Sequence, residues 1–202
     1  MSTYKKRDKS KKRVAILTSA KKVFIRLGYK EASMDFIAET AGISKKTVYN
    51  HFNSKENLFE VIVTEILKQR QTKKPIAYNP NIELEDQLLA FAESEISLID
   101  TPQKLELSRF LTLTFLNDLD FQRKIVSKYP PMQNDLIIWL QAAIDDKRIK
   151  TKNIQMTARI FYSLVIGSIT WPVLFTNGLD KHATELLLEE IIALFLARYK
   201  AT

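Results

Sequence analysis

Residues 33–52 carry the pattern that most restricts the fold of this 202-residue chain. Ser33 and Ser44 are suited to N-cap helices, because a serine hydroxyl accepts a hydrogen bond from a free backbone N–H at a helix start. Gly42 lies between them and permits a sharp turn, since glycine adopts backbone conformations that other residues avoid. Apolar residues recur at helical spacing on both sides of this glycine. The pattern therefore predicts two short helices joined by a tight turn, with the second helix at residues 45–52.

The rest of the chain is expected to be helical as well. Only four glycines and six prolines interrupt it, and 46% of its residues are hydrophobic, which favours an all-α protein with a substantial core. Two prolines mark the clearest linker. We expect a basic disordered arm at residues 1–12, a helix-turn-helix unit with a further helix at residues 13–72, a linker at residues 73–81, and a larger helical domain at residues 82–202.

Charge is distributed unevenly along the chain. Residues 1–74 hold 18 lysines and arginines against 7 acidic residues, a net charge of +11, whereas residues 75–202 hold 13 against 16, a net charge of −3. Such asymmetry indicates a nucleic-acid-binding end joined to a domain with another task. A solvated basic face without a partner is the alternative. The basic arm likewise has two interpretations, a solubilising tail or a segment that contacts DNA phosphates.

Several classes of function are disfavoured. The chain has no cysteine and only two histidines, and it shows no serine–histidine–acid arrangement and no metal-ligand spacing. We therefore expect no enzymatic activity, no cofactor and no metal site. The longest apolar run, residues 160–175, falls short of the roughly 20 residues that span a bilayer. With no export signal in view, we expect no membrane partner and a cytoplasmic location.

The second predicted helix carries side chains suited to DNA. A helix fits the major groove, where lysine can contact guanine, asparagine can contact adenine, and threonine can contact a base or a thymine methyl group. Tyrosine and histidine can donate hydrogen bonds to phosphate oxygens, which fix register rather than sequence. In a helix-turn-helix it is the second helix that enters the groove. The DNA-binding candidates are Ser33, Ser44, Lys45, Lys46, Thr47, Tyr49, Asn50, His51 and Lys55.

This order of residues closely resembles the TetR/AcrR family of transcriptional regulators over about residues 13–60. The shared elements are Phe24, Gly28-Tyr29, Ile37-Ala38, Ala41-Gly42-Ile43-Ser44, Thr47-Val48-Tyr49, His51-Phe52, Ser54-Lys55-Glu56 and Leu58. The resemblance implies that residues 13–72 form a three-helix DNA-binding domain with a connecting helix, and that residues 82–202 form a domain for ligand binding and dimerisation. It implies phosphate contacts for Tyr49, His51 and Lys55. It implies base or phosphate contacts for Lys45, Lys46, Thr47 and Asn50. Lys46 stands where the family often has glycine, which adds charge but alters how closely the backbone can approach DNA.

For the rear half, the resemblance implies a homodimer formed through the last two helices and a small, largely apolar effector bound among the middle helices. The last two helices, expected at residues 153–175 and 180–199, are apolar over a wider arc than one packed face requires. A monomer with both helices in its core is the alternative. The effector-pocket candidates are Phe91, Arg109, Phe110, Phe115, Trp139, Phe161, Tyr162 and Trp171. For the aromatic candidates the alternative is ordinary core packing, and for Arg109 it is a surface salt bridge.

The sequence as a whole predicts a ligand-responsive transcriptional repressor that binds a palindromic operator in double-stranded DNA as a dimer. An effector that binds only a state with the wrong spacing between recognition helices would release the repressor from DNA. A constitutive regulator, or an activator without effector control, is the alternative, and an enzyme is much less favoured.

Overall fold

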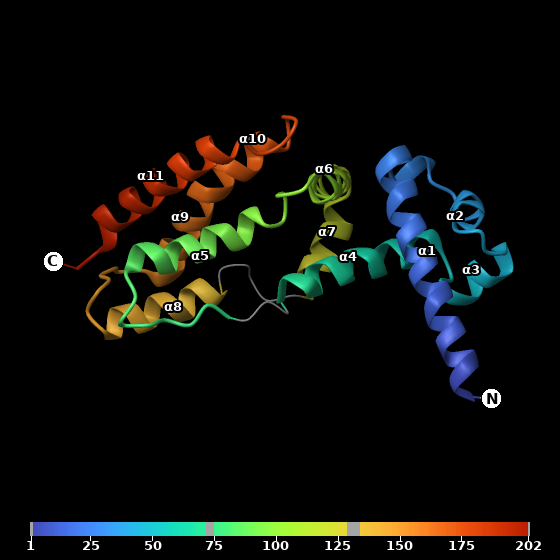
Figure 1. The fold of residues 1–202 in the computed structure, drawn as a ribbon, viewed down its shortest axis with the longest axis horizontal. Coiled ribbons are helices and arrows are strands. Elements are labelled where there is room, and N and C mark those ends of the chain that lie inside the picture. Colours follow the sequence, from blue (N-terminus) through green and yellow to red (C-terminus); the bar gives the residue numbers. More distant parts are fainter. Residues whose placement is uncertain (1, 72–74, 129–133, 202) are drawn as a thin grey trace. The chain divides into compact units, whose positions relative to one another are not determined.

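The computed structural model describes residues 2–71, 75–128 and 134–201, and it confirms the predicted all-α fold (Figure 1). The helices are α1 (Ser2–Glu31), α2 (Met34–Ala41), α3 (Lys45–His51), α4 (Lys55–Gln71), α5 (Leu84–Ile96), α6 (Pro102–Asn117), α7 (Leu119–Val126), α8 (Asn134–Asp145), α9 (Ile154–Val165), the π-helical turn η1 (Ile166–Thr170), α10 (Trp171–Val173) and α11 (Lys181–Tyr199). Within the described ranges, no helix is both long enough and apolar enough to cross a membrane.

The described residues form two compact units, each discontinuous in sequence. Unit 1 contains α1 to α4 together with residues 109–128, and unit 2 contains residues 75–108 and 134–201. We expected all residues after the linker to form the rear domain, so the grouping of residues 109–128 with the N-terminal helices differs from that expectation. The boundary between the units falls inside α6. Residues 72–74, where the predicted linker begins, lie outside the described residues.

Helix α1 is longer than the sequence predicted, because it includes the basic arm. We expected residues 1–12 to be disordered, but the helix begins at Ser2. Lysine and arginine have high helix propensity, and neither glycine nor proline precedes Gly28, so the arm extends the helix that the apolar residues beyond it stabilise. Gly28 has a φ of 78°, a left-handed conformation that kinks α1 just before its last turn.

An aromatic cluster explains why α6 and α7 contribute to unit 1. Phe59 of α4 is buried, and its ring centroid lies 5.5 Å from that of Phe24 in α1. The same ring lies 5.6 Å from Phe110 of α6 and 5.2 Å from Phe121 of α7. Edge-on and tilted aromatic pairs at such distances add stability beyond the apolar area that they bury. The cluster thus joins segments that are far apart in the sequence.

An acid-sensitive contact links α7 to α4 within unit 1. Glu60 accepts hydrogen bonds from Lys128 and, at 3.3 Å, from Lys124, and these contacts lower the pKa of its carboxyl group. A folded-state pKa below the unfolded value adds stability that is present at neutral pH and is lost as the pH falls through the folded value.

We therefore expect Glu60→Gln to lower the free energy of unfolding at neutral pH by about 0.5–1 kcal/mol, since both lysines are largely exposed. At an acidic pH below this lowered pKa the wild-type carboxyl group is protonated, and the difference should shrink. Urea unfolding of both proteins at neutral pH and at this acidic pH measures the difference in the free energy of unfolding. Glu106→Gln, at an exposed glutamate of α6, is the control, and an equal loss for Glu60→Gln at both pH values would contradict the assignment.

Unit 2 is built around one core shared by α5, α8, α9 and α11 (Figure 1). Each of these helices contributes apolar side chains at helical spacing, which is why the sequence showed amphipathic segments there. The largest fully buried side chains of this core are Leu84, Phe91, Trp139, Phe161 and Phe195.

The long helix expected at residues 153–175 is interrupted by the π-helical turn η1. Pro172 lacks the N–H that a regular helical turn requires, and its ring crowds the preceding turn. Just before it, the N–H of Trp171 donates to the carbonyl of Ile166, which makes the wider π-helical turn. The N-caps Asn153 and Asp180 each accept a hydrogen bond from a backbone N–H, so α9 and α11 start where the sequence placed them.

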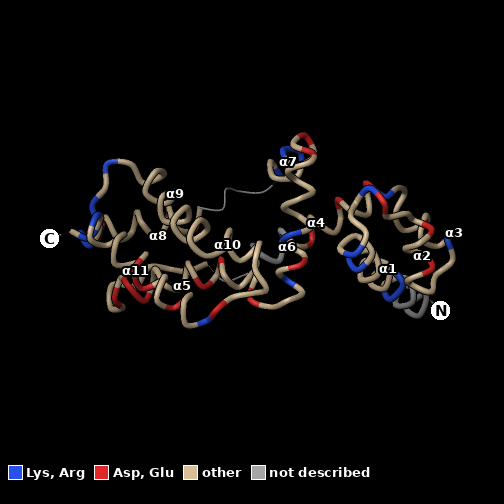
Figure 2. The backbone as a smooth tube through the Cα atoms, turned by 90° about the horizontal axis from the view of Figure 1, so that it is seen from above, with Lys and Arg blue, Asp and Glu red and all other residues tan. Residues whose placement is uncertain are grey.

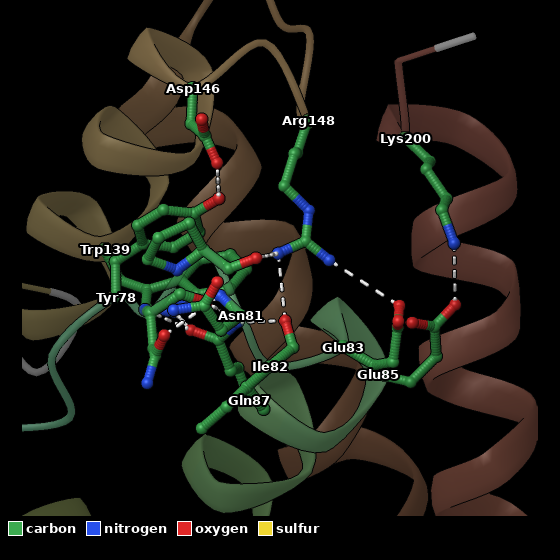
Figure 3. Close-up of polar contacts among 12 residues, drawn as sticks. Tyr78, Asn81, Ile82, Glu83, Glu85, Gln87, Trp139, Asp146, Arg148 and Lys200 are labelled. Atoms are coloured by element: carbon green, nitrogen blue, oxygen red, sulfur yellow. Dashed lines mark hydrogen bonds and ion pairs between the residues drawn. The ribbon is translucent and has the colours of Figure 1, made fainter.

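Gln87, a buried glutamine of α5, fixes the segment that leads into α5 (Figure 3). The Nε2 of Gln87 donates to the carbonyl oxygens of Asn79 and Ile82, both at 2.9 Å. Its Oε1 accepts from the N–H of Asn79 and from the indole N–H of Trp139, also at 2.9 Å. All four hydrogen-bonding positions of the amide are therefore used inside the protein.

The Arg148 side chain holds the same segment by binding backbone carbonyl groups of that segment (Figure 3). Its guanidinium donates to the carbonyl oxygens of Pro80 at 3.1 Å and Ile82 at 2.9 Å, and it lies 3.6 Å from the carboxylate of Glu83. The Tyr78 hydroxyl also donates to Asp146. The second half of the predicted linker at residues 73–81 is therefore an anchored part of unit 2.

Candidate nucleic-acid interface

Helices α2 and α3 form the predicted helix-turn-helix, and serine hydroxyls cap both of them. The Ser33 hydroxyl accepts a hydrogen bond from the N–H of Phe36 at 3.1 Å at the start of α2. The Ser44 hydroxyl accepts from the N–H of Thr47 at 3.4 Å at the start of α3. Each bond satisfies a backbone donor that has no partner within its own helix. These two hydroxyls, predicted as part of the DNA-binding set, thus define where the helices begin.

The turn and the buried face of α3 orient the second helix. Gly42 has a φ of 62°, and the N–H of Ile43 donates to the carbonyl of Ala38 at 3.0 Å, which closes the end of α2. On α3 and at its end, Val48 and Phe52 are 0% and 1% exposed. Because these side chains lie four residues apart on one face, the other positions of α3 are turned away from the core.

The side chains that α3 presents to solvent are of types that bind DNA. Lys46, Tyr49 and Asn50 are exposed, and their spacing of three and four residues places them on one face of the helix. Thr47 and His51 are half-buried. A cation, a phenol and an amide in this arrangement can contact phosphate oxygens and base edges in a major groove.

Two of the predicted DNA-binding side chains have partners within the protein. The Nζ of Lys45 lies 2.5 Å from Oδ2 of Asp35, so an exposed ion pair joins α3 to α2. The hydroxyls of Thr47 and Ser44 lie 2.8 Å apart. Asp35 is an acidic residue in the first turn of α2. No local signal points to Lys45 as its partner, because the two residues become neighbours only when the turn at Gly42 forms.

Lys55, a predicted phosphate ligand, begins α4 and contacts the end of α1. Its Nζ donates to the carbonyl oxygens of Tyr29 at 2.9 Å, Lys30 at 3.0 Å and Ala32 at 3.0 Å. It also lies 4.7 Å from the centroid of the Tyr29 ring. These intramolecular contacts were not implied by the resemblance, and the contact of Lys55 with DNA stays a prediction.

Positive charge follows α1 within unit 1. Figure 2 shows basic residues in blue along this helix. The guanidinium of Arg13 lies 4.6 Å from the centroid of the Phe52 ring at the end of α3, a cation–π contact. The exposed cations of α1 whose side chains are described include Lys11, Lys12, Lys22, Arg26 and Lys30. Clustered cations of this kind supply the salt-dependent, sequence-independent part of DNA affinity.

The predicted effector-pocket residues are divided between the two units. Four share the core of unit 2, namely Phe91, Trp139, Phe161 and Tyr162. Three belong to unit 1, namely Arg109, Phe110 and Phe115. The eighth, Trp171, is 47% exposed, and its ring centroid lies 5.4 Å from that of Phe175. Within unit 2, the indole N–H of Trp139 is already donated to Gln87.

A capped helix-turn-helix with a basic, exposed second helix defines the class of DNA-binding regulators. Comparison with known families narrows this class. The profile of "Bacterial regulatory proteins, tetR family" matches residues 16–62, and that of "AefR-like transcriptional repressor, C-terminal domain" matches residues 86–201. The chain belongs to the TetR family of transcriptional regulators. Members of this family bind DNA, act as dimers and are not enzymes.

Individual relatives agree with this assignment. The uncharacterized HTH-type transcriptional regulator YhgD of Bacillus subtilis (strain 168) is 27% identical over 158 residues, which are 76% of this chain and 80% of YhgD. A TetR family transcriptional regulator from Pseudomonas syringae pv. tomato str. DC3000 has a crystal structure that matches with a TM-score of 0.76 at 27% identity, covering 93% of this chain and 96% of that one. The flavonoid-responsive regulator FrrA shares the fold, with a TM-score of 0.74 at 23% identity over 95% and 98% of the two chains.

Proposed function

We propose that this chain is a homodimeric repressor that binds a palindromic operator and is released by a small, largely apolar effector. The observation that carries the proposal is the exposed face of α3, with Lys46, Tyr49 and Asn50 on a helix anchored by Val48 and Phe52. The profile of a repressor's C-terminal domain supports the negative sign of regulation. Because chromosomal DNA is the proposed partner, we place the protein in the cytoplasm.

The contacts that we propose follow from what α3 exposes. Lys46 and Asn50 contact base edges or phosphates, and Tyr49 and His51 donate to phosphate oxygens. Ser33 and Ser44 act indirectly, as caps. Lys45 and Thr47 have intramolecular partners in this structure, and each keeps further hydrogen-bonding capacity with which we propose that it contacts a base or a phosphate.

Replacing Lys46 by alanine tests this interface directly. If Lys46 neutralises a phosphate, Lys46→Ala should reduce the slope of log affinity against log salt concentration by roughly 1. Stability should change by less than about 0.5 kcal/mol, because the side chain is exposed. Fluorescence anisotropy with a labelled duplex from upstream of the protein's own gene measures the slope. Lys104→Ala, in the part of α6 that belongs to unit 2, is the control, and an unchanged slope for Lys46→Ala would remove this contact from the proposal.

A second copy of the chain is the partner that we propose for α9, α10 and α11. Both predicted dimerisation segments keep apolar side chains in solvent although their other faces fill the core of unit 2. The exposed apolar residues are Met156, Ile160, Trp171, Phe175, Leu186, Leu187 and Leu194. At Gly167, an added Cβ would meet no described atom within 4 Å apart from its chain neighbours and the backbone of its own helix. A helix that is apolar on several faces is normally covered on all of them, which supports association through these segments.

Dimerisation determines the symmetry of the operator that we propose. Two copies of α3 separated by about 34–36 Å would reach successive turns of the same groove, so the operator should be palindromic. A change in unit 2 that alters this spacing would weaken binding to DNA, and an effector that favours the altered state would shift the population toward it.

We propose the core of unit 2 as the effector site, since Phe91, Phe161 and Tyr162 lie in it together with Trp139. A thermal-shift screen with aromatic and aliphatic metabolites tests this proposal. A compound that raises the melting temperature and also lowers duplex affinity would support an effector-controlled repressor. The alternative is ordinary core packing of these buried side chains in a regulator without effector control, and a screen with no such compound would support it.

A further inference from the structure

We infer that Lys55 is a positioning residue of the DNA-binding unit, whose ammonium group closes the end of α1 and thereby fixes the start of α2. The inference rests on the proposed binding of DNA. It gives Lys55 a task other than the phosphate contact that the resemblance implied, and it concerns only residues of unit 1.

The carbonyl oxygens at the end of α1 need donors from outside the helix. The last carbonyls of any α-helix have no partner within it, and cations are favourable at that end. Lys55 supplies the donors, with three carbonyl oxygens at 2.9–3.0 Å from its Nζ. An ammonium group has three N–H donors, so this set uses the whole hydrogen-bonding capacity of the side chain. A phosphate could be bound only by breaking one of these bonds.

Tyr29 holds the Lys55 side chain in place. The ammonium lies 4.7 Å from the centroid of the Tyr29 ring, and the Tyr29 hydroxyl donates to Oε1 of Glu56, the next residue of α4, at 3.2 Å. The ring also lies 4.9 Å from the centroid of Phe59. Burial and the nearby Glu56 carboxylate raise the pKa of Tyr29 to about 12, so its hydroxyl remains a donor at neutral pH. Two consecutive residues of α4 thus hold both the backbone and the ring at the end of α1.

The end of α1 leads directly into the DNA-reading elements. Ala32, whose carbonyl accepts from Lys55, is followed by Ser33, the N-cap of α2. The first turn of α2 carries Asp35, which pairs with Lys45 of α3. A shift of the Ala32 carbonyl would therefore move the start of α2 and, through that ion pair and the packing of α2 on α3, the face that α3 presents.

Lys55→Met tests the inference, because methionine keeps most of the stem and removes the donors. Binding to a labelled duplex from upstream of the protein's own gene is measured over a series of salt concentrations, with circular dichroism showing that the variant is folded. We expect affinity to fall about tenfold at every salt concentration, with the salt slope unchanged, because geometry changes but no phosphate contact is lost. We also expect a lower denaturation midpoint. Lys46→Met is the matched variant. For it we expect a smaller salt slope and an unchanged denaturation midpoint.

The possible outcomes separate the roles of Lys55. A salt slope smaller by roughly 1 for Lys55→Met would make it a phosphate ligand and overturn the inference. An unchanged affinity with a lower midpoint would reduce Lys55 to a purely structural role and overturn it equally. If Lys55→Met does not fold, Lys55→Arg decides. Arginine binds phosphate well, but its planar guanidinium does not direct three bonds to convergent carbonyls, so retained affinity would contradict positioning.

Failure of the proposed function would look different. A wild-type protein with no salt-dependent affinity for any duplex would remove the DNA-binding proposal itself. The change in denaturation midpoint of Lys55→Met would still report whether Lys55 closes the end of α1.

Discussion

Leu194→Asp should convert the proposed dimer into a monomer and reduce operator affinity by roughly 10²–10⁴-fold, because a dimer binds its second half-site as an intramolecular step. Leu194 of α11 is 61% exposed in the single chain, so the substitution should leave the fold of the protomer intact. Between two copies, an aspartate would place a charge in an apolar contact, which is strongly unfavourable. Analytical ultracentrifugation measures the mass, and anisotropy with an operator duplex measures the affinity.

Leu113→Asp is the matched control for this experiment. Leu113 of α6 is also 61% exposed, but it belongs to unit 1, whereas the segments proposed to pair belong to unit 2. We expect that variant to remain a dimer with the affinity of the wild type. A Leu194→Asp protein that stays dimeric would show that copies of the chain associate through another surface.

Gln87→Leu should lower the free energy of unfolding by about 3 kcal/mol, since it leaves several partly or fully buried polar groups without partners. Leucine has nearly the volume of glutamine but neither donors nor acceptors. The indole N–H of Trp139 and the N–H and carbonyl of Asn79 would lose their bonds to this residue. Arg148 would still contact the carbonyl of Ile82, so part of the segment would remain held. Urea unfolding measures the loss.

Gln141→Leu provides the comparison for Gln87→Leu. Gln141 of α8 is exposed and donates to Asp145 at 2.8 Å, so its loss should cost no more than about 0.5 kcal/mol. If the two variants unfolded at the same urea concentration, the network around Gln87 would have no net stabilising effect.

The helix-turn-helix could be predicted from the sequence because its signals are local. Ser33, Gly42 and Ser44 each act on backbone groups within a few residues, so their identities are sufficient to place the two helices. The same applies to the exposed face of α3, which follows from the spacing of Val48 and Phe52. The family resemblance then added what local physics does not supply, namely the proposed partners of the exposed side chains.

The makeup of the two units could not be predicted, because it depends on contacts between distant segments. Phe110 was predicted as an effector-pocket residue and Phe121 fell within the expected rear domain, and nothing near them in the sequence indicates that they pack on Phe59. Gln87 did leave a signal, since it is a polar residue at helical spacing between Leu84 and Phe91, but its partners lie elsewhere in the chain. The contacts of Lys55 were hidden for the same reason.

The participation of residues 109–128 in unit 1 has a consequence for dissecting this regulator. Unit 1 cannot be isolated by truncating the chain at one position, because it consists of two separate stretches of polypeptide. A fragment that stops in the linker would retain α2 and α3 but would strip Phe110 and Phe121 from Phe59. Exposed aromatic rings favour aggregation, so we expect that such a fragment would not fold and bind DNA on its own.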